Sequence, residues 1–166
     1  KFSFGFVFIT APFDIPFGRF SDFPDEETRW NEHLKYELLP IIKKKLRLHD
    51  NLPIYFMAYS GGAILILSGA HLHNRCFGVG LLGADGMNTE MISGSSWKEP
   101  ITIYYNRQDP VFYSNKNTLE ELVSYDELFF YRTLNGYHSL NDYIKNDSFS
   151  GLIRRANRIL KLTQIC

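Results

Sequence analysis

Short apolar segments alternate along the chain with stretches whose apolar residues recur at helical spacing. The apolar segments are Phe2–Ile9, Leu52–Tyr59, Cys76–Leu82, Ile101–Tyr105 and Leu128–Thr133. Their length and their Val, Ile, Phe and Tyr content are typical of strands. Most of them lack a polar residue at every second position, which indicates a parallel sheet that is covered on both faces.

The stretches between these segments predict helices. Residues 30–46 carry an apolar stripe at helical spacing, and we expect Pro40 to kink or split that helix. Residues 61–72 are apolar all round, which predicts a buried helix, and residues 117–124 and 149–162 predict two more. The stripe consists of Trp30, Leu34, Leu38, Ile41 or Ile42, and Leu46. The alternation of strands and helices predicts one domain, residues 1–166, folded as a three-layer α/β/α sandwich with a mostly parallel sheet of about five strands.

Composition and charge narrow the class of protein. The 166 residues are 45% hydrophobic, which excludes a disordered chain, and 18 basic residues balance 18 acidic ones. This balance gives no electrostatic reason to expect nucleic acid as a partner, and no apolar run approaches the roughly 18 residues of a membrane span. Cys76 and Cys166 are too few for a disulfide scaffold, and no Cys/His spacing predicts a metal site. Because Phe2–Ile9 is typical of a strand rather than a signal peptide, we expect a cytoplasmic location.

The segment after the second predicted strand has the pattern of a nucleophile turn. It reads Ala58-Tyr59-Ser60-Gly61-Gly62 and leads at once into the buried helix, which is the strand–turn–helix context of a nucleophile elbow. Small residues at 58 and 62 permit the sharp turn that would expose Ser60, although alanine stands where the motif's first glycine is usual. The Gly61 N–H would face a developing oxyanion at the positive end of the helix. The alternative is a turn that only enters a buried helix.

A serine nucleophile needs a base, and the base needs an orienting carboxylate. Asp109 lies in the turn after the strand at 101–105, and His138 lies in the turn after the strand at 128–133. Ligands of a parallel sheet bind at the carboxyl ends of its strands, so these turns are expected to meet Ser60 there. The order Ser60, Asp109, His138 is the order that the hydrolase sandwich uses.

With these motifs the chain resembles an α/β-hydrolase of the serine carboxylesterase or acyl-thioesterase kind. The resemblance runs from Phe6 to about Leu160 and includes the elbow, the acid turn at 106–111 and the histidine turn at 136–138. It implies Ser60 as nucleophile, His138 as general base and then acid, and Asp109 as orienting carboxylate, with no metal or organic cofactor. Asp85 follows the strand at 76–82 and is the competing acid, which we rank second.

Such hydrolases normally have several strands before the elbow strand, whereas one is predicted here. We therefore expect either that the chain lacks the amino-terminal part of the fold, or that its first strand takes the adjacent place and residues 10–13 form the oxyanion loop. In the second case, Gly61 and Ala11 supply the oxyanion donors. Aromatic side chains on the loops around Ser60 are expected to bind an acyl or aryl group: Phe13, Tyr59, Phe112 and Tyr137.

The reaction expected from this resemblance is hydrolysis of a small-molecule carboxylic ester or thioester through an acyl-enzyme. One alternative is a non-catalytic α/β-hydrolase-like binding domain, since the shortened amino-terminal region leaves the oxyanion hole open to question. A second, weaker alternative is a flavodoxin-like domain that binds an anion at the helix start after Ser60. That alternative leaves Asp109 and His138 without a role.

Overall fold

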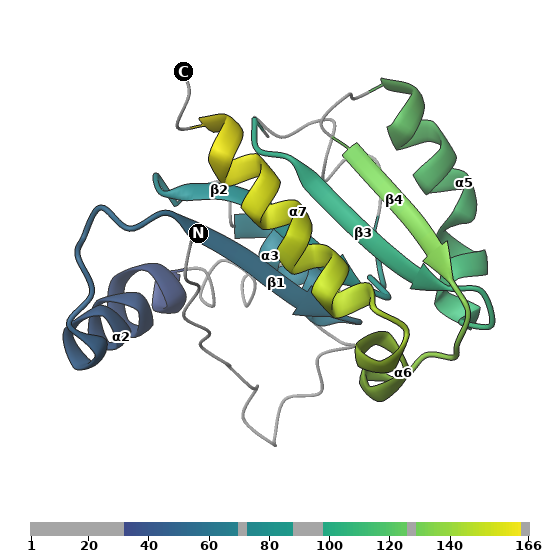
Figure 1. The fold of residues 1–166 in the computed structure, drawn as a ribbon, viewed down its shortest axis with the longest axis horizontal. Coiled ribbons are helices and arrows are strands. Elements are labelled where there is room, and N and C mark those ends of the chain that lie inside the picture. The colour runs from purple at the N-terminus through teal and green to yellow at the C-terminus, as the bar shows by residue number, and fades with distance from the viewer. Residues whose placement is uncertain (1–31, 70–72, 88–97, 126–128, 164–166) are drawn as a thin grey trace.

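The computed structural model describes residues 32–69, 73–87, 98–125 and 129–163 (Figure 1). Within them, strands β1 (Ile54–Tyr59), β2 (Cys76–Leu82), β3 (Ile101–Asn106) and β4 (Phe129–Leu134) form one sheet in the order β1-β2-β3-β4. All three strand pairs are parallel. The predicted α/β class with a parallel sheet is therefore confirmed, while the predicted strand Phe2–Ile9 lies outside the described residues.

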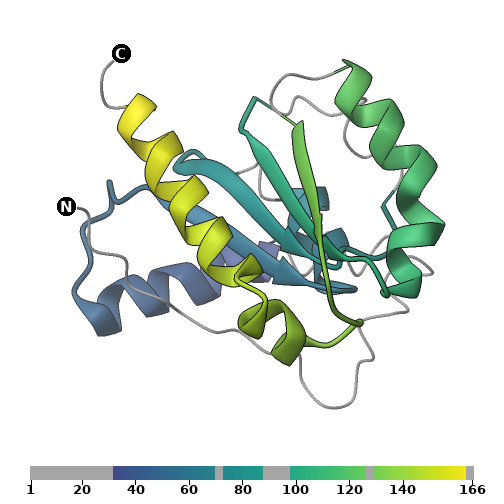
Figure 2. The same ribbon diagram turned by 45° about the vertical axis from the view of Figure 1, so that its right-hand side comes forward.

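Helices cover both faces of this sheet, as Figures 1 and 2 show. Helix α7 (Ser148–Thr163) crosses one face over β2 and β3. Helices α3 (Gly62–Gly69) and α5 (Pro110–Tyr125) pack on the other face, where their buried residues share a hydrophobic cluster with the strands. Because each crossover returns the chain to the same end of the sheet, the turns after the strands gather along one edge.

The strands divide their side chains between two cores. On β3, Ile101, Ile103 and Tyr105 point into the core beneath α3 and α5, and Tyr104 points into the core beneath α7. Successive side chains of a strand alternate between faces, so an apolar run can fill both cores at once. This arrangement explains why the strand segments lack polar alternation in the sequence.

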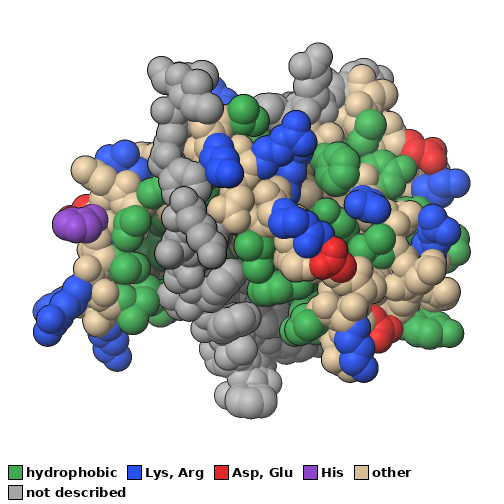
Figure 3. All heavy atoms as spheres, viewed as in Figure 1, with side chains coloured by type: hydrophobic (Ala, Val, Ile, Leu, Met, Phe, Trp, Pro, Cys, Tyr) green, Lys and Arg blue, Asp and Glu red, His purple; other side chains and the backbone are tan. Residues whose placement is uncertain are grey.

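Helix α7 shows the opposite pattern, with one buried and one solvated side. Leu152, Ala156 and Ile159 are buried at helical spacing. Its outer face carries basic side chains, which are visible as blue spheres over α7 in Figure 3. The predicted helix at 149–162 is thus present in full, and it extends one residue further at each end.

The amino-terminal helical region departs from prediction in its packing. A π-helical turn, Leu34–Leu38, precedes α2 (Leu39–Leu46), and Pro40 stands in the first turn of α2, where its missing N–H is tolerated. The predicted apolar stripe is wrong at Ile41 and Leu46, which are 50% and 55% exposed, whereas Ile42, the alternative to Ile41, is half-buried. Leu34, Leu38 and Leu39 reach the hydrophobic core, whereas the later turns of α2 extend beyond it (Figure 1).

Two helix starts also differ from the sequence prediction. Helix α5 begins at Pro110 rather than near residue 117, because Oδ1 of Asp109 accepts the Val111 N–H at 2.9 Å and caps the helix. A short helix, α6 (Leu140–Lys145), precedes α7, and the hydroxyl of Ser139 caps it by accepting the Asp142 N–H at 3.1 Å. In the described part of the chain, the longest helices have 16 residues, fewer than the roughly 20 that a bilayer span needs.

Candidate active site

Ser60 occupies a sharp turn between β1 and α3. Its φ of 52° lies in the left-handed region, which costs a non-glycine residue about 1–3 kcal/mol and is held only where the surroundings enforce it. Here the Ser60 N–H donates to the Leu82 carbonyl at 2.9 Å. The Ser60 carbonyl accepts N–H groups from Ala63 and Asp85 at 3.0 and 3.3 Å. These bonds fix the backbone of the turn against the end of β2.

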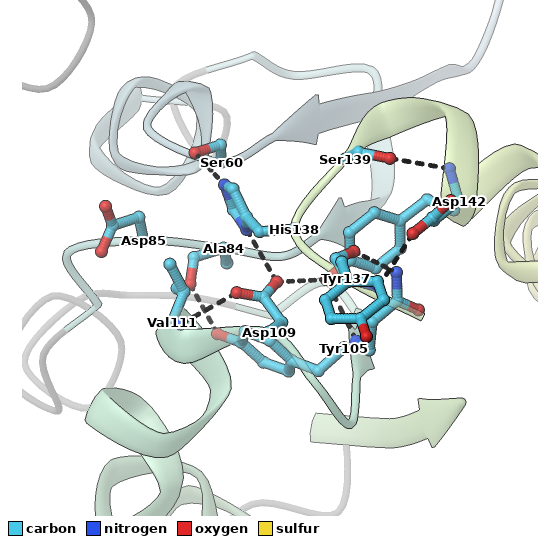
Figure 4. A network of polar contacts seen from close by, with 12 residues as sticks. Ser60, Ala84, Asp85, Tyr105, Asp109, Val111, Tyr137, His138, Ser139 and Asp142 are labelled. Carbon is cyan, nitrogen blue, oxygen red and sulfur yellow. Dashed lines mark hydrogen bonds and ion pairs between the residues drawn. The ribbon is translucent and has the colours of Figure 1, made fainter. Parts of the chain in front are cut away.

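The structure brings Ser60, His138 and Asp109 together at the carboxyl ends of the strands (Figure 4). The Oγ of Ser60 lies 2.9 Å from Nε2 of His138, and Nδ1 of His138 lies 2.7 Å from Oδ2 of Asp109. Because the carboxylate can only accept at Nδ1, that nitrogen carries the proton and Nε2 is left to accept from the Ser60 hydroxyl. These contacts join residues that are 78 and 29 positions apart.

Asp109 is fully buried, and its two oxygens have separate partners. Oδ1 accepts the Val111 N–H at the start of α5. Oδ2 accepts from His138 and from the hydroxyl of Tyr143, each at 2.7 Å. A buried carboxylate is costly unless donors replace water, and these three donors do so.

The competing acid, Asp85, does not contact the imidazole. Asp85 is exposed, and its Oδ1 accepts the N–H of Gly86 at 2.9 Å. In Figure 4 its carboxylate points away from His138. The geometry therefore favours Asp109 as the partner of the histidine.

The predicted substrate-binding aromatics lie in different surroundings. The ring of Tyr59 stacks on the imidazole of His138 with a centroid distance of 5.2 Å, and burial followed by the charge of Asp109 raises the pKa of its hydroxyl. Phe112 packs against the core ring of Tyr105, and Tyr137 is 68% exposed beside His138. Phe13 lies outside the described residues.

Of the two predicted oxyanion donors, Gly61 lies in the described part of the chain. Gly61 directly follows Ser60 and is buried. Within the described part of the chain, its N–H has no hydrogen-bond acceptor, so the donor is available to a reacting carbonyl. Ala11 lies outside the described residues.

A polar clamp that was not predicted joins the acid turn to the histidine turn. Asn106, at the end of β3, donates from its side chain to the Tyr137 carbonyl at 2.7 Å and accepts from the side chain of Asn146. The Gln108 side chain accepts the Gly136 N–H at 2.7 Å, and the Gly136 carbonyl accepts the Gln108 N–H at 3.1 Å. The available signal for this clamp was a run of polar residues, 106–109, directly after a buried strand.

Among the described residues, no group of three His, Cys, Asp or Glu side chains is arranged to hold a metal ion.

Comparisons with known proteins give a likeness in structure and none in sequence. No protein-family model matches the chain, and no curated protein matches it by sequence. Among solved structures, the chain is similar to S-formylglutathione hydrolase (FrmB) from Staphylococcus aureus, crystallised as the apoenzyme, with a TM-score of 0.48 and 13% sequence identity. The likeness covers 80% of this chain and 63% of that chain.

Proposed function

We propose that the chain is a serine hydrolase that cleaves a carboxylic ester or thioester of a small molecule through an acyl-enzyme. The observation that carries this proposal is the unbroken contact from the Ser60 hydroxyl through His138 to Asp109, with Ser60 on a left-handed turn. A surface histidine that formed chance contacts would not need a buried carboxylate on one nitrogen and a strained serine on the other.

The proposed reaction begins when the Ser60 oxygen attacks the acyl carbon and its proton passes to Nε2 of His138. Asp109 keeps the imidazole oriented and stabilises the imidazolium that forms. Collapse of the tetrahedral intermediate breaks the bond to the alcohol or thiol, which leaves with the proton from His138. Water then attacks the acyl-enzyme, His138 takes its proton, and release of the acid restores the Ser60 hydroxyl.

The oxyanion of each tetrahedral intermediate would accept the Gly61 N–H and a second donor near Ala11. A single oxyanion donor contributes about 3–4 kcal/mol of transition-state stabilisation in hydrolases of this mechanism. The availability of the Gly61 N–H supports its assignment to this role.

A fluorophosphonate probe tests the proposal directly, because it reacts with an activated serine and reports the modified residue by peptide mapping. We expect labelling at Ser60 that is lost in Ser60→Ala and in His138→Ala. Ser124→Ala is the matched control, since Ser124 is an exposed serine at the end of α5, and it should label like the wild type. A folded wild-type chain that neither labels at Ser60 nor cleaves p-nitrophenyl acetate would instead support the non-catalytic binding domain.

A further inference from the structure

Tyr143 reaches the candidate triad from a different element, the short helix α6. It is fully buried, and its hydroxyl donates to Oδ2 of Asp109 at 2.7 Å. The same hydroxyl oxygen accepts the backbone N–H of Asn106 at 3.1 Å. Since an N–H can only donate, the phenol must accept there and is left to direct its own proton at the carboxylate.

The structure leaves room for this contact at Gly83. A Cβ on Gly83 would lie 2.7 Å from the Tyr143 hydroxyl and 3.1 Å from Oδ2 of Asp109. Gly83 also has a φ of +53°, which favours glycine. The chain after β2 therefore has no side chain at the one point where it would separate the phenol from the carboxylate.

The ring of Tyr143 also packs against the aromatic ring that stacks on His138. It meets the ring of Tyr59 edge-on at a centroid distance of 5.9 Å, and Tyr59 stacks on His138. Tyr143 thus contacts the carboxylate of Asp109 through its hydroxyl, and its ring packs against the Tyr59 ring that stacks on the imidazole.

We propose that Tyr143 is a positioning residue of the triad: its hydroxyl fixes Oδ2 of Asp109 in the orientation that receives His138. This inference rests on the proposed hydrolase function. Burial and then the hydrogen bond to Asp109 raise the pKa of Tyr143 above its ordinary value, so the phenol remains a donor throughout the working pH range.

The other titratable groups near Asp109 in the described residues are His138, Tyr59 and Tyr105. Tyr105 is equally buried, but its hydroxyl donates to the Ala84 carbonyl at 2.7 Å and not to the carboxylate. Tyr59 contacts His138 through its stacked ring. Asp85 is exposed, and its charge acts on the hydroxyl of Tyr105. Tyr105 is therefore a matched control for the loss of a buried tyrosine hydroxyl.

The test compares Tyr143→Phe with Tyr105→Phe in ester hydrolysis across pH. Without the Tyr143 hydroxyl, the anionic pair formed by Asp109 and His138 loses a donor and binds a proton more readily. We expect kcat to fall about tenfold with KM within about twofold, and the acid limb of the pH–rate profile to move up by about 0.5 pH unit. Tyr105→Phe should leave the midpoint of that limb in place. A wild-type kcat and midpoint in Tyr143→Phe would overturn the inference.

A second readout separates this inference from the proposed function. The ring proton of His138 can be followed by NMR titration in the same variants, with or without turnover. A His138 titration midpoint that is higher in Tyr143→Phe than in the wild type supports the positioning role, even if the probe does not label Ser60. A midpoint equal to that of the wild type overturns the role, even if the probe labels Ser60. Should Tyr143→Phe not fold, 3-fluorotyrosine at position 143 supplies a stronger donor with the same shape, and the midpoint should then move down; an unmoved midpoint again overturns the inference.

Discussion

The side-chain amide of Asn106 donates to the backbone carbonyl of Tyr137 at 2.7 Å, so the last residue of β3 holds the residue next to His138. Asn106 is fully buried, and its carbonyl oxygen accepts from the side chain of Asn146. In the structure it ties the acid turn to the histidine turn, and it thereby sets where the imidazole lies.

Asn106→Ala is expected to lower both stability and turnover. The variant leaves the Tyr137 carbonyl without its side-chain donor, which should cost about 1–3 kcal/mol of unfolding free energy. Because the histidine turn loosens, kcat should fall about tenfold or more while KM changes little. Urea unfolding and p-nitrophenyl acetate kinetics measure the two effects. Asn117→Ala, an exposed asparagine on α5, should leave both unchanged, and equal losses in the two variants would contradict this account.

Asp109→Asn and Asp85→Asn distinguish the two candidate acids. Asparagine at 109 can keep an acceptor for the Val111 N–H, but it places an NH2 group where Oδ2 accepts from His138 and Tyr143, and it removes the charge that stabilises the imidazolium. We expect kcat to fall about ten-thousandfold at nearly constant KM. Asp85→Asn changes an exposed side chain and should retain most of the wild-type kcat. The reverse ranking would transfer the role to Asp85.

Gly83→Ala should be poorly tolerated, and Gly62→Ala should be accepted. At Gly83, a methyl group would approach the Tyr143 hydroxyl to 2.7 Å in a left-handed backbone, so we expect a loss of about 2 kcal/mol or more. At Gly62, the nearest side-chain atom to a new Cβ is 3.8 Å away, and alanine in the first turn of α3 should stabilise by about 0.4–1 kcal/mol. Thermal melting compares the two, and similar shifts of Tm would count against the close approach at Gly83.

The hydrogen bonds that Asp147 accepts predict that the free energy of unfolding depends on pH. Hydrogen bonds from Arg154 and Ser150 lower the pKa of this exposed carboxyl to about 2 in the folded chain. Since the folded value lies below the unfolded one, the contribution is present above about pH 4 and is lost as pH falls through about 2. Asp147→Asn should therefore melt slightly lower than wild type at pH 6, and the difference should shrink toward pH 3. Added salt should reduce it at pH 6, and a gap that is constant with pH would contradict the assignment.

The four strands and the three candidate triad residues could be predicted because both depend on local sequence. Apolar runs bounded by turn residues located β1 to β4 to within about two residues, and reading the residue after each strand end selected Ser60, Asp109 and His138. The roles of these three residues stay a prediction. The predicted first strand, Ala11 and Phe13 lie outside the described residues, so the structure does not test them.

The supporting contacts could not be predicted because they depend on pairings between distant elements. Tyr143 lies in a helix of 6 residues, too short to show a period, and its partner Asp109 is 34 positions away. The apolar stripe of α2 was wrong at Ile41 and Leu46 for the opposite reason: their spacing is right, but among the described residues neither belongs to the hydrophobic core. Periodicity indicates which side of a helix can be buried, and only the packed chain decides how far that burial extends.

The backbone hydrogen bonds of Ser60 decide which side chains this turn can accommodate. None of the three uses the side chain: one comes from its N–H and two go to its carbonyl. A thiol or a methyl group installed at this position should accordingly occupy the same spot without rearranging the strand or the helix. The backbone of the turn thus fixes the position of the side chain at residue 60, and the atom at the end of that side chain determines the chemistry.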